Sequence, residues 1–354
     1  MLTYHPQPDK MMRILHVVHQ YPPEHSGGTE FYTNWLTQAL QQRQHQVAIF
    51  HRNSGINSGM QQRDEAGVTV WSAWDGDMSP NGRFRATFGN RSLHQSFAQV
   101  LTKFHPQLIH MQHIMGLPTT IAKQIQKASI PYVVTLHDYF YGCANAQLIT
   151  NYDNSICNGP DKWLNCARCA LARANKPDVA VARPFIAPLL GIRHRLLRQV
   201  LAKAATLIAP SEFVKQQYAT LGLPTHHMQV IRHGIELPDK INQQLLAEER
   251  PFPQPPLNIT YIGGLAWQKG VHLLITAVNQ LSADSAQLTI YGDPEPFPSY
   301  VAQLKQAANP QFIHFGGKLA RQDLWPVLAK TDILVVPSIW YETSSLIIQE
   351  AQAA

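Results

Sequence analysis

Short apolar runs alternate with longer mixed segments along most of the chain. Residues 13–19 and 132–136 are continuous, β-branched runs, which are typical of buried strands in a parallel sheet. The segment 92–103 between two such runs has the length and apolar spacing of a helix. This alternation predicts βαβ units and therefore an α/β protein. Further strands are expected at 46–51, 108–113, 206–210, 257–262, 287–291, 312–315 and 333–337, and further helices up to residue 42 and at 118–128, 271–281 and 321–330.

The pattern is interrupted where polar residues, glycine and proline accumulate. Residues 53–67 are polar and residues 75–91 are rich in Gly, Asn and Arg, so both are expected to be loops. Residues 237–257 contain five prolines, which indicates a linker between domains. A chain of 354 residues is also long for one hydrophobic core. We therefore predict one domain over 1–236, the linker, and a second domain over 258–354.

Composition narrows the class of protein. The hydrophobic content of 45% and the charged content of 15% fit a folded chain, and no apolar run is long enough to span a membrane. The first twelve residues lack the apolar core of a signal peptide, so a cytoplasmic protein is expected. The formal charge of +6 favours anionic ligands or an anionic membrane surface. Without a dense Lys/Arg run, nucleic-acid binding is not expected.

The stretch 341–351, Y-E-T-S-S-L-I-I-Q-E-A, follows the last predicted strand and is expected to open a helix. Thr343, Ser344 and Ser345 place small hydroxyl residues at the helix start, where free backbone N–H groups favour a phosphate. Glu342 and Glu350 flank this start. Two carboxylates on either side of an anion site suit a ligand with hydroxyls at both ends and negative charge in the middle, such as a nucleotide-sugar. The alternative is a loop carboxylate and a surface carboxylate without a ligand.

Two glycine pairs follow predicted strands. Gly27 and Gly28 lie between the first strand and the first helix, where a glycine loop and a helix start form a phosphate-binding turn, although a plain tight turn has the same signature. Gly263 and Gly264 follow the first strand of the second half. Their backbone N–H groups are expected to approach a phosphate, with Lys269 adding a positive charge.

His137 and Asp138 stand directly after the strand at 132–136. Ligands of open α/β sheets bind at the carboxyl ends of the strands, and a His there can donate to an oxygen or exchange a proton near neutral pH. The alternative is a His that only pairs with its own Asp or with backbone.

All four cysteines fall within one insertion, residues 139–170. A Cys-x-x-Cys pair and two upstream thiols in a short loop indicate a structural Zn²⁺ site with four thiolate ligands. Free thiols or a redox pair are the alternatives, because the upstream spacing is wider than in a usual zinc knuckle. The candidate ligands are Cys143, Cys157, Cys166 and Cys169.

Residues 186–205 form a predicted amphipathic helix with a basic face, which would suit an anionic bilayer. An ordinary domain helix with a solvated basic face is the favoured alternative. Its apolar positions are Leu189, Leu190, Leu196, Leu197, Val200 and Leu201, and its basic positions are Arg193, Arg195, Arg198 and Lys203.

Together these motifs resemble the retaining glycosyltransferases of family four, whose GT-B fold has two facing Rossmann-like domains. The resemblance rests on E-x7-E at 342–350, Y-I-G-G-L-x-x-x-K-G at 261–270 and A-P-S-E-F at 209–213, with the Gly27–Gly28 loop and the His137–Asp138 pair at the expected places. Relatives commonly have Arg at the position of Gly264 and continue beyond the position of Ala354, so an incomplete second domain is expected.

The resemblance implies roles for these residues. Glu350 would bind the ribose, Glu342 the transferred sugar, and Lys269 with the backbone of residues 343–346, including Leu346, the diphosphate. His137 would line the catalytic centre near the sugar, while Gly27 and Gly28 would approach the phosphates and the acceptor. The implied reaction is hexosyl transfer with retention of configuration from a nucleotide-diphosphate sugar to a glycan or lipid-linked acceptor, in polysaccharide or envelope glycan synthesis, without a catalytic metal. A non-catalytic nucleotide-sugar-binding relative and a nucleotide-sugar isomerase remain alternatives.

Overall fold

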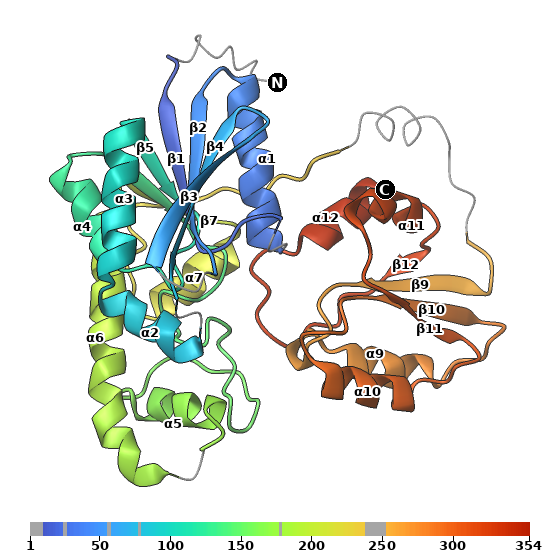
Figure 1. Ribbon diagram of the computed structural model, residues 1–354. Coiled ribbons are helices and arrows are strands. Elements are labelled where there is room, and N and C mark those ends of the chain that lie inside the picture. Colours follow the sequence, from blue (N-terminus) through green and yellow to red (C-terminus); the bar gives the residue numbers. More distant parts are fainter. Residues whose placement is uncertain (1–9, 24–26, 55–57, 77–78, 177–178, 238–252) are drawn as a thin grey trace. The chain divides into compact units, whose positions relative to one another are not determined.

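The computed structural model describes all residues except 1–9, 24–26, 55–57, 77–78, 177–178 and 238–252. The chain divides into two compact units, Met1–Gly234 and Ile235–Ala354, each with its own sheet (Figure 1). Most of the predicted linker, residues 238–252, lies outside the described residues. Each unit is an α/β layer structure, as the alternating pattern predicts.

The first unit contains an eight-stranded sheet with the order β3-β4-β2-β1-β5-β6-β7-β8. Neighbouring strands are parallel except for β3 and β4, which are antiparallel. β1, β2 and β5 are almost entirely buried, which explains their continuous apolar sequences. The strands are β1 (Arg13–Val18), β2 (Gln46–Arg52), β3 (Ser58–Glu65), β4 (Val68–Asp75), β5 (Leu108–Met111), β6 (Tyr132–Thr135), β7 (Thr206–Ala209) and β8 (Met228–Val230).

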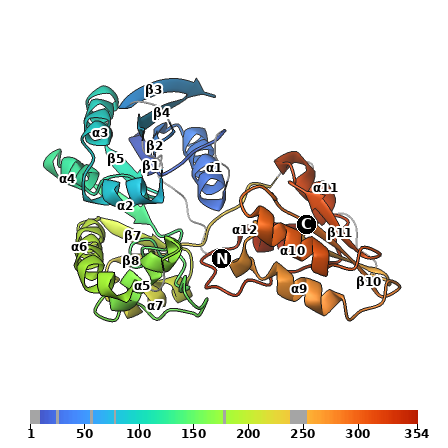
Figure 2. The ribbon, with the colours of Figure 1, turned by 60° about the horizontal axis from the view of Figure 1, so that its bottom comes forward.

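Helices cover both faces of this sheet. Figures 1 and 2 show α1 on one side of the β1–β2 region and α3 on the other. α3 presents an apolar stripe to the sheet and is capped by Asn90, whose side chain accepts from the backbone N–H of Leu93 at 3.0 Å. The helices are α1 (Gly28–Gln42), α2 (Pro80–Phe88), α3 (Arg91–Phe104), α4 (Thr120–Lys127), α5 (Leu164–Arg173), η1 (Ala180–Ala182), α6 (Arg183–Ala202) and α7 (Glu212–Thr220).

The two predicted loops are wrong in part. β3 occupies much of 53–67, and it escaped detection because an exposed, charged edge strand has no apolar alternation. α2 lies within 75–91, where Gly and Asn suggested a loop. Its start does carry a helix signal, since Ser79 accepts from the N–H of Gly82 at 2.9 Å and Pro80 occupies the first turn.

The basic face predicted for α6 also needs a correction. Arg193 is buried rather than solvated, and its guanidinium donates to the carbonyl of Phe140 at 2.8 Å and lies 4.6 Å from the centre of the Phe140 ring. Burial lowers the pKa of Arg193 to about 10, and it remains charged at neutral pH. This residue therefore ties α6 to the segment that follows β6.

The second unit contains a four-stranded parallel sheet with the order β11-β10-β9-β12. β12 is shorter than the predicted strand at 333–337, and the helix predicted at 321–330 is divided into η3 and α11. Leu288, Ile290 and Ile275 are fully buried in the core between sheet and helices. The elements are β9 (Leu257–Ile262), η2 (Trp267–Lys269), α9 (Val271–Val278), β10 (Ala286–Tyr291), α10 (Pro298–Ala307), β11 (Ile313–Gly317), η3 (Arg321–Asp323), α11 (Leu324–Leu328), β12 (Ile333–Leu334) and α12 (Leu346–Ala353).

Each sheet has a topological switch point, where the connections from two adjacent parallel strands lead to opposite sides of the sheet. In the first unit this switch point lies between β1 and β5, and in the second unit between β9 and β12. Open α/β sheets bind ligands outside the carboxyl ends of the strands at such points. The topology therefore directs attention to the loops after β1 and β5 and to those after β9 and β12.

Candidate functional site

The switch point of the first unit is lined by histidines. His19 follows β1 and His113 follows β5, and their ring centres lie 4.3 Å apart. His19 Nε2 lies 3.6 Å from a carboxylate oxygen of Glu30 on α1. His113 accepts from the N–H of Met115 at Nδ1, so its Nε2 carries the proton that faces Asp138 at 3.1 Å. Two acid–histidine pairs therefore meet at the reversal of the sheet.

Glu30 also occupies the start of α1. Its carboxylate accepts hydrogen bonds from the backbone N–H groups of Gly27 and of Glu30 itself, while burial, the dominant influence, raises its pKa. A Cβ atom on Gly27 would lie 2.7 Å from a Glu30 oxygen, so a side chain at this position would displace the carboxylate. The protein's own carboxylate thus fills the anion site at this helix start. Phosphate binding by Gly27 and Gly28 stays a prediction, and this geometry favours the second unit as the place for the phosphates.

His137 lies at the carboxyl end of β6, beside the histidine pair. Its Nε2 donates to Oε1 of Gln112 at 2.9 Å, and its ring centre lies 5.2 Å from Tyr32 and 4.9 Å from His233. Burial, followed by the neighbouring histidines, lowers the pKa of His137 well below its ordinary value. His137 is therefore neutral at pH 7 and gives its one N–H to Gln112, while Asp138 pairs with His113 and with the N–H of Phe140.

The sequence interpretation missed most of this cluster. His19, Glu30, Gln112, His113 and His233 were not singled out, although His19 and His113 follow strands as directly as His137 does. His19 and His113 were read as the last residues of the predicted strands 13–19 and 108–113. The strand order that makes these two histidines neighbours is not visible in the sequence. Glu30 had a local signal, because an acid three residues after an N-cap position commonly closes a helix start.

In the second unit, three donors converge on one oxygen of Glu342. Lys269 Nζ lies 2.7 Å, Ser338 Oγ 2.6 Å and Trp340 Nε1 2.9 Å from Glu342 Oε1. Burial alone would raise the pKa of Glu342, but the charge of Lys269 and these hydrogen bonds outweigh it and lower the pKa. Glu342 is therefore an ionised carboxylate held in a fixed position in the loop between β12 and α12.

The backbone locks the Lys269 turn onto the segment that carries Glu342. Gly270 has a φ of +70°, and a Cβ atom there would lie 2.0 Å from the carbonyl oxygen of Pro337. The N–H of Ile339 donates to the carbonyl of Gln268 at 3.0 Å. This close contact and this hydrogen bond join the two loops at the switch point directly. Only glycine fits at position 270, because any side chain there would collide with the Pro337 carbonyl.

Gly263 and Gly264 form the loop after β9. The hydroxyl of Tyr261 donates to the carbonyl of Gly264 at 2.8 Å and braces the turn, and burial raises the pKa of Tyr261. A Cβ atom on Gly264 would meet nothing within 4 Å among the described atoms. The space around Gly264, where the resemblance to family four predicts Arg, is therefore open in this chain.

The helix predicted within 341–351 begins later than expected, at Leu346, so Glu342 and the three hydroxyl residues belong to the preceding loop. In the described part of the chain, no side chain caps this helix start and no acid lies in its first turn. Unlike α1, α12 thus has no acid in its first turn to compete with an anionic ligand.

Glu350 is buried within α12, so the surface-carboxylate alternative is wrong for this residue. Its Oε1 lies 2.5 Å from Nη1 of Arg321. This contact is an ion pair without hydrogen-bond geometry, and Oε1 receives no hydrogen bond from the described residues. The guanidinium of Arg321 offsets the cost of burying this carboxylate.

The four cysteines of the insertion are free and lie near one another. Each of the six pairs of thiols interacts electrostatically; burial and these neighbours raise the pKa of Cys166 to about 12 and that of Cys169 to about 11. The N–H of Asn151 donates to the sulfur of Cys169 at 3.3 Å. Within the residues that the structure describes, no three His, Cys, Asp or Glu side chains stand in an arrangement that would hold a metal ion. The zinc site stays a prediction.

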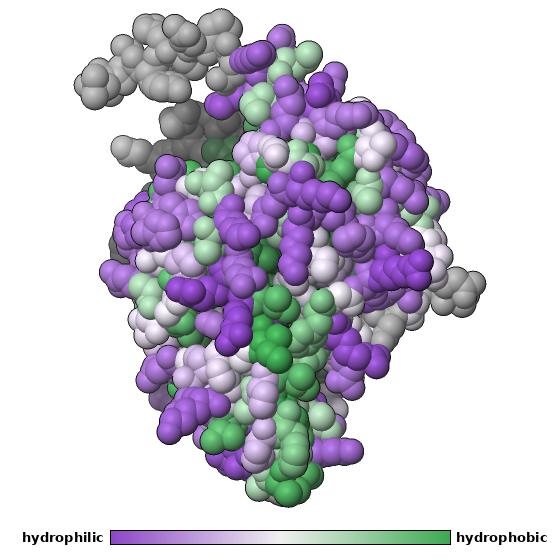
Figure 3. Space-filling model, turned by 90° about the vertical axis from the view of Figure 1, so that its left-hand side faces the viewer, coloured by the Kyte–Doolittle hydropathy of each residue, from purple (hydrophilic) through white to green (hydrophobic). Residues whose placement is uncertain are grey.

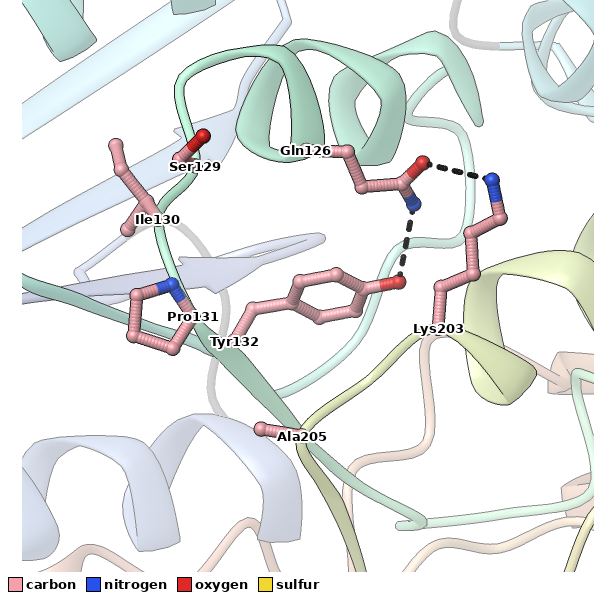
Figure 4. A pocket seen from close by; sticks show the side chains of 7 residues that line it. All are labelled: Gln126, Ser129, Ile130, Pro131, Tyr132, Lys203 and Ala205. Atoms are coloured by element: carbon pink, nitrogen blue, oxygen red, sulfur yellow. Dashed lines mark hydrogen bonds between the residues drawn. The ribbon is translucent and has the colours of Figure 1, made fainter.

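A hollow near β6 is not the site. Its lining includes Tyr132, which begins β6, and Ala205, which precedes β7, so it lies at the amino ends of the strands (Figure 4). Gln126 links Tyr132 and Lys203 through contacts of 3.4 Å. Ligand sites of open sheets lie at the opposite edge.

Two family models match the chain. A glycosyl transferase 4-like domain matches residues 27–234, and a glycosyl transferases group 1 domain matches residues 256–354. The chain therefore belongs to the glycosyltransferases, and its two Rossmann-like units are those of the GT-B fold.

Individual relatives agree with this assignment. Glycogen synthase of Mycobacterium tuberculosis is 28% identical over 363 residues, which cover 97% of this chain and 76% of that protein. Among solved structures, the sucrose-phosphate synthase of Thermosynechococcus elongatus has a TM-score of 0.67 at 16% identity and covers 96% of this chain and 78% of that one. Anabaena Alr3699/HepE in complex with UDP-glucose has a TM-score of 0.57 at 19% identity, with coverages of 97% and 78%. These structural similarities confirm the predicted fold.

Proposed function

We propose that this glycosyltransferase moves a hexosyl group from a nucleotide-diphosphate sugar to a glycan or lipid-linked acceptor with retention of configuration, in polysaccharide or envelope glycan synthesis. One observation carries the proposal. At the switch point of the second unit, Lys269 contacts the fixed carboxylate of Glu342, and the uncapped start of α12 and the buried carboxylate of Glu350 follow Glu342 along the chain. This is the order in which a sugar, a diphosphate and a ribose would need partners.

The diphosphate is assigned to the start of α12 and to Lys269. The N–H groups of residues 343–346 and the positive end of the helix attract anions, and no acid in the first turn competes with them. Lys269 already lies 2.7 Å from Glu342, so its charge is in position before a ligand arrives. A phosphate oxygen beside Lys269 would share that ammonium with Glu342.

The two carboxylates would hold the two ends of the donor. Glu350 is a buried carboxylate paired with Arg321, and its oxygens have lone pairs that can also accept from ribose hydroxyls. Glu342 is ionised, so it can accept hydroxyls of the transferred sugar but cannot donate to them. These assignments require hydroxyl groups on both sides of the diphosphate.

The first unit would supply the surroundings of the acceptor and of the reacting sugar. His137 is neutral and already donates its Nε2–H to Gln112, so it carries no charge that would attract a phosphate, and it suits the surroundings of a sugar better. In the proposed reaction the bond from the anomeric carbon to the phosphate oxygen breaks, the acceptor oxygen bonds to the same face of that carbon, and the acceptor proton passes to the departing phosphate. No protein nucleophile is needed for this course.

The first donor to test is UDP-glucose, because the Anabaena structure contains it. Turnover would be followed with a panel of nucleotide-sugars and glycan acceptors, and the anomeric configuration of the product would be read by NMR. A product with the configuration of the donor supports the proposal, whereas an inverted product contradicts it. A rearranged nucleotide-sugar formed without acceptor would indicate an isomerase, and tight binding without any product would indicate a non-catalytic relative.

A matched pair of variants tests the site itself. Lys269→Met removes the charge that faces Glu342 and is expected to lower kcat/KM by roughly 10- to 100-fold, the loss of a charge-assisted contact. Lys330→Met removes an exposed lysine of the same unit and is expected to leave activity unchanged. Equal activity of both variants would contradict the assigned phosphate role.

A further inference from the structure

The outer side of α6 carries a continuous apolar stripe. Phe185, Leu189 and Ile192 follow one another at helical spacings of four and three residues and are 77%, 48% and 47% exposed. Val181, in the preceding turn η1, extends the stripe by one more step of four and is also exposed. Helix surfaces that face water are normally polar, so this stripe is unusual for a solvated helix.

The stripe is not needed for the fold of the first unit. A different side of α6 faces the core through Ala187, Leu190, Leu197 and Val200, which are buried. The first two of these pack with Ala167 of α5. α6 is thus apolar on two sides along its first turns, and only one of them has a partner within the described chain. Figure 3 faces the side of the molecule on which α6 lies and shows a column of hydrophobic surface bordered by hydrophilic residues.

Positive charge surrounds the stripe. Residues 162–211, which contain α5, η1, α6 and β7, hold nine Lys or Arg and one Asp, a formal charge of +8, whereas the whole chain carries +6. Arg195 and Arg198 on α6, and Lys203 directly after it, are exposed beyond the apolar stripe, and Arg173 and Lys176 are exposed before it. An apolar stripe between exposed cations is complementary to a surface that is anionic at its headgroups and apolar beneath them.

We propose that α6 binds in the plane of an anionic phospholipid surface, with Phe185, Leu189 and Ile192 inserted among the acyl chains and the flanking cations at the lipid headgroups. Among the described residues, no helix has the length and apolar content that spanning a bilayer requires. Such contact would bring the transferase to lipid-linked acceptors, but binding to lipid does not depend on catalysis. The proposal therefore stands apart from the proposed reaction.

Vesicle co-sedimentation of the full chain tests this inference. The probe is phosphatidylglycerol mixed into phosphatidylcholine, with phosphatidylcholine alone as the neutral surface. We expect binding to the anionic vesicles and weak binding to the neutral ones. Phe185→Ser with Leu189→Ser should reduce the partition coefficient on the order of 100-fold, because two partly inserted apolar side chains are lost. Arg195→Gln with Arg198→Gln should reduce it by roughly 25-fold at low salt, about fivefold for each cation.

The chain offers a matched control for the apolar pair. Leu273 on α9 is 49% exposed, so Leu273→Ser removes an equally exposed leucine from the second unit and should not alter binding. Equal loss in this variant and in the α6 variant would overturn the proposal, as would wild-type binding by the α6 variant or failure of the wild type to sediment with anionic vesicles. Self-association that disappears in the α6 variant, without vesicle binding, would assign the stripe to a second copy instead. Turnover of a water-soluble acceptor, unchanged in folded α6 variants, separates this test from that of the reaction.

Discussion

Replacing Glu350 by Gln tests whether this buried carboxylate recognises a ribose. The substitution keeps the shape of the side chain and removes its charge. A hydrogen bond to a charged group contributes about 1.5–3 kcal/mol and one between neutral groups about 0.5–1.5, so the charge contributes about 1 kcal/mol for each hydroxyl. With two ribose hydroxyls, donor binding should weaken by about 1–3 kcal/mol, or roughly 5- to 150-fold in Kd.

The fold should tolerate this change. Glu350 forms an ion pair with Arg321, whose side chain is 34% exposed and can turn to water when the carboxylate is removed. The cost of burying the carboxylate opposes the gain from the ion pair, so the free energy of unfolding should change by less than about 1 kcal/mol. A loss of affinity without a loss of stability would assign Glu350 to the ligand.

Titration calorimetry with UDP and its 2′- and 3′-deoxy analogues would measure the effect. The wild type should lose affinity when a hydroxyl is removed, whereas Glu350→Gln should bind UDP and the deoxy analogues more nearly alike. Glu295→Gln, at an exposed glutamate of the same unit, is the control. The ribose assignment is refuted if the variant discriminates against the deoxy analogues as strongly as the wild type does.

Three further predictions follow from the two units. Gly264→Arg should tighten UDP binding by about 1–2 kcal/mol, because open space at this position admits a cation; Gly264→Ala is its control, and equal calorimetric affinities would contradict the expectation. Burial lowers the pKa of His110 to about 3 and that of His233 to about 4, so both stay neutral when folded but take up protons when unfolded below pH 6.5. Their contribution to stability is complete above about pH 6.5 and falls as the pH drops; urea unfolding at about pH 5.5 should show a loss of roughly 3 kcal/mol, and an unchanged midpoint would rule this out. Anaerobically purified protein should hold about one zinc per chain, whereas four titratable thiols with no metal by elemental analysis would exclude a tight site. The thiols concerned are Cys143, Cys157, Cys166 and Cys169.

The parts of the site that could be predicted are those that follow buried strands directly. Gly263, Glu342 and His137 were found because an apolar run ends just before them, and the carboxyl end of a parallel strand is where ligands bind. The fold class followed from the same alternation of strands and helices. These features depend on local sequence, so one chain is enough to reveal them.

The missed parts depend on contacts between distant segments. His19 and His113 become neighbours only because β1 and β5 are adjacent, although 94 residues separate the two histidines. The burial of Arg193 and the ion pair of Glu350 likewise depend on tertiary packing. β3 was missed for a different reason, because its charged sequence suits an exposed edge and resembles a loop.

The close approach of Gly270 to the carbonyl of Pro337 has a consequence for the thermodynamics of ligand binding. The turn that carries Lys269 and the segment that carries Glu342 cannot shift independently, so these charged groups are ordered before a donor arrives. Little conformational entropy should then be lost from this part of the protein on association. Selectivity among donors would be set by how well each ligand replaces the existing contacts of Glu342. The segment that carries Glu342 is already in place, so it cannot adapt to a sugar of a different shape.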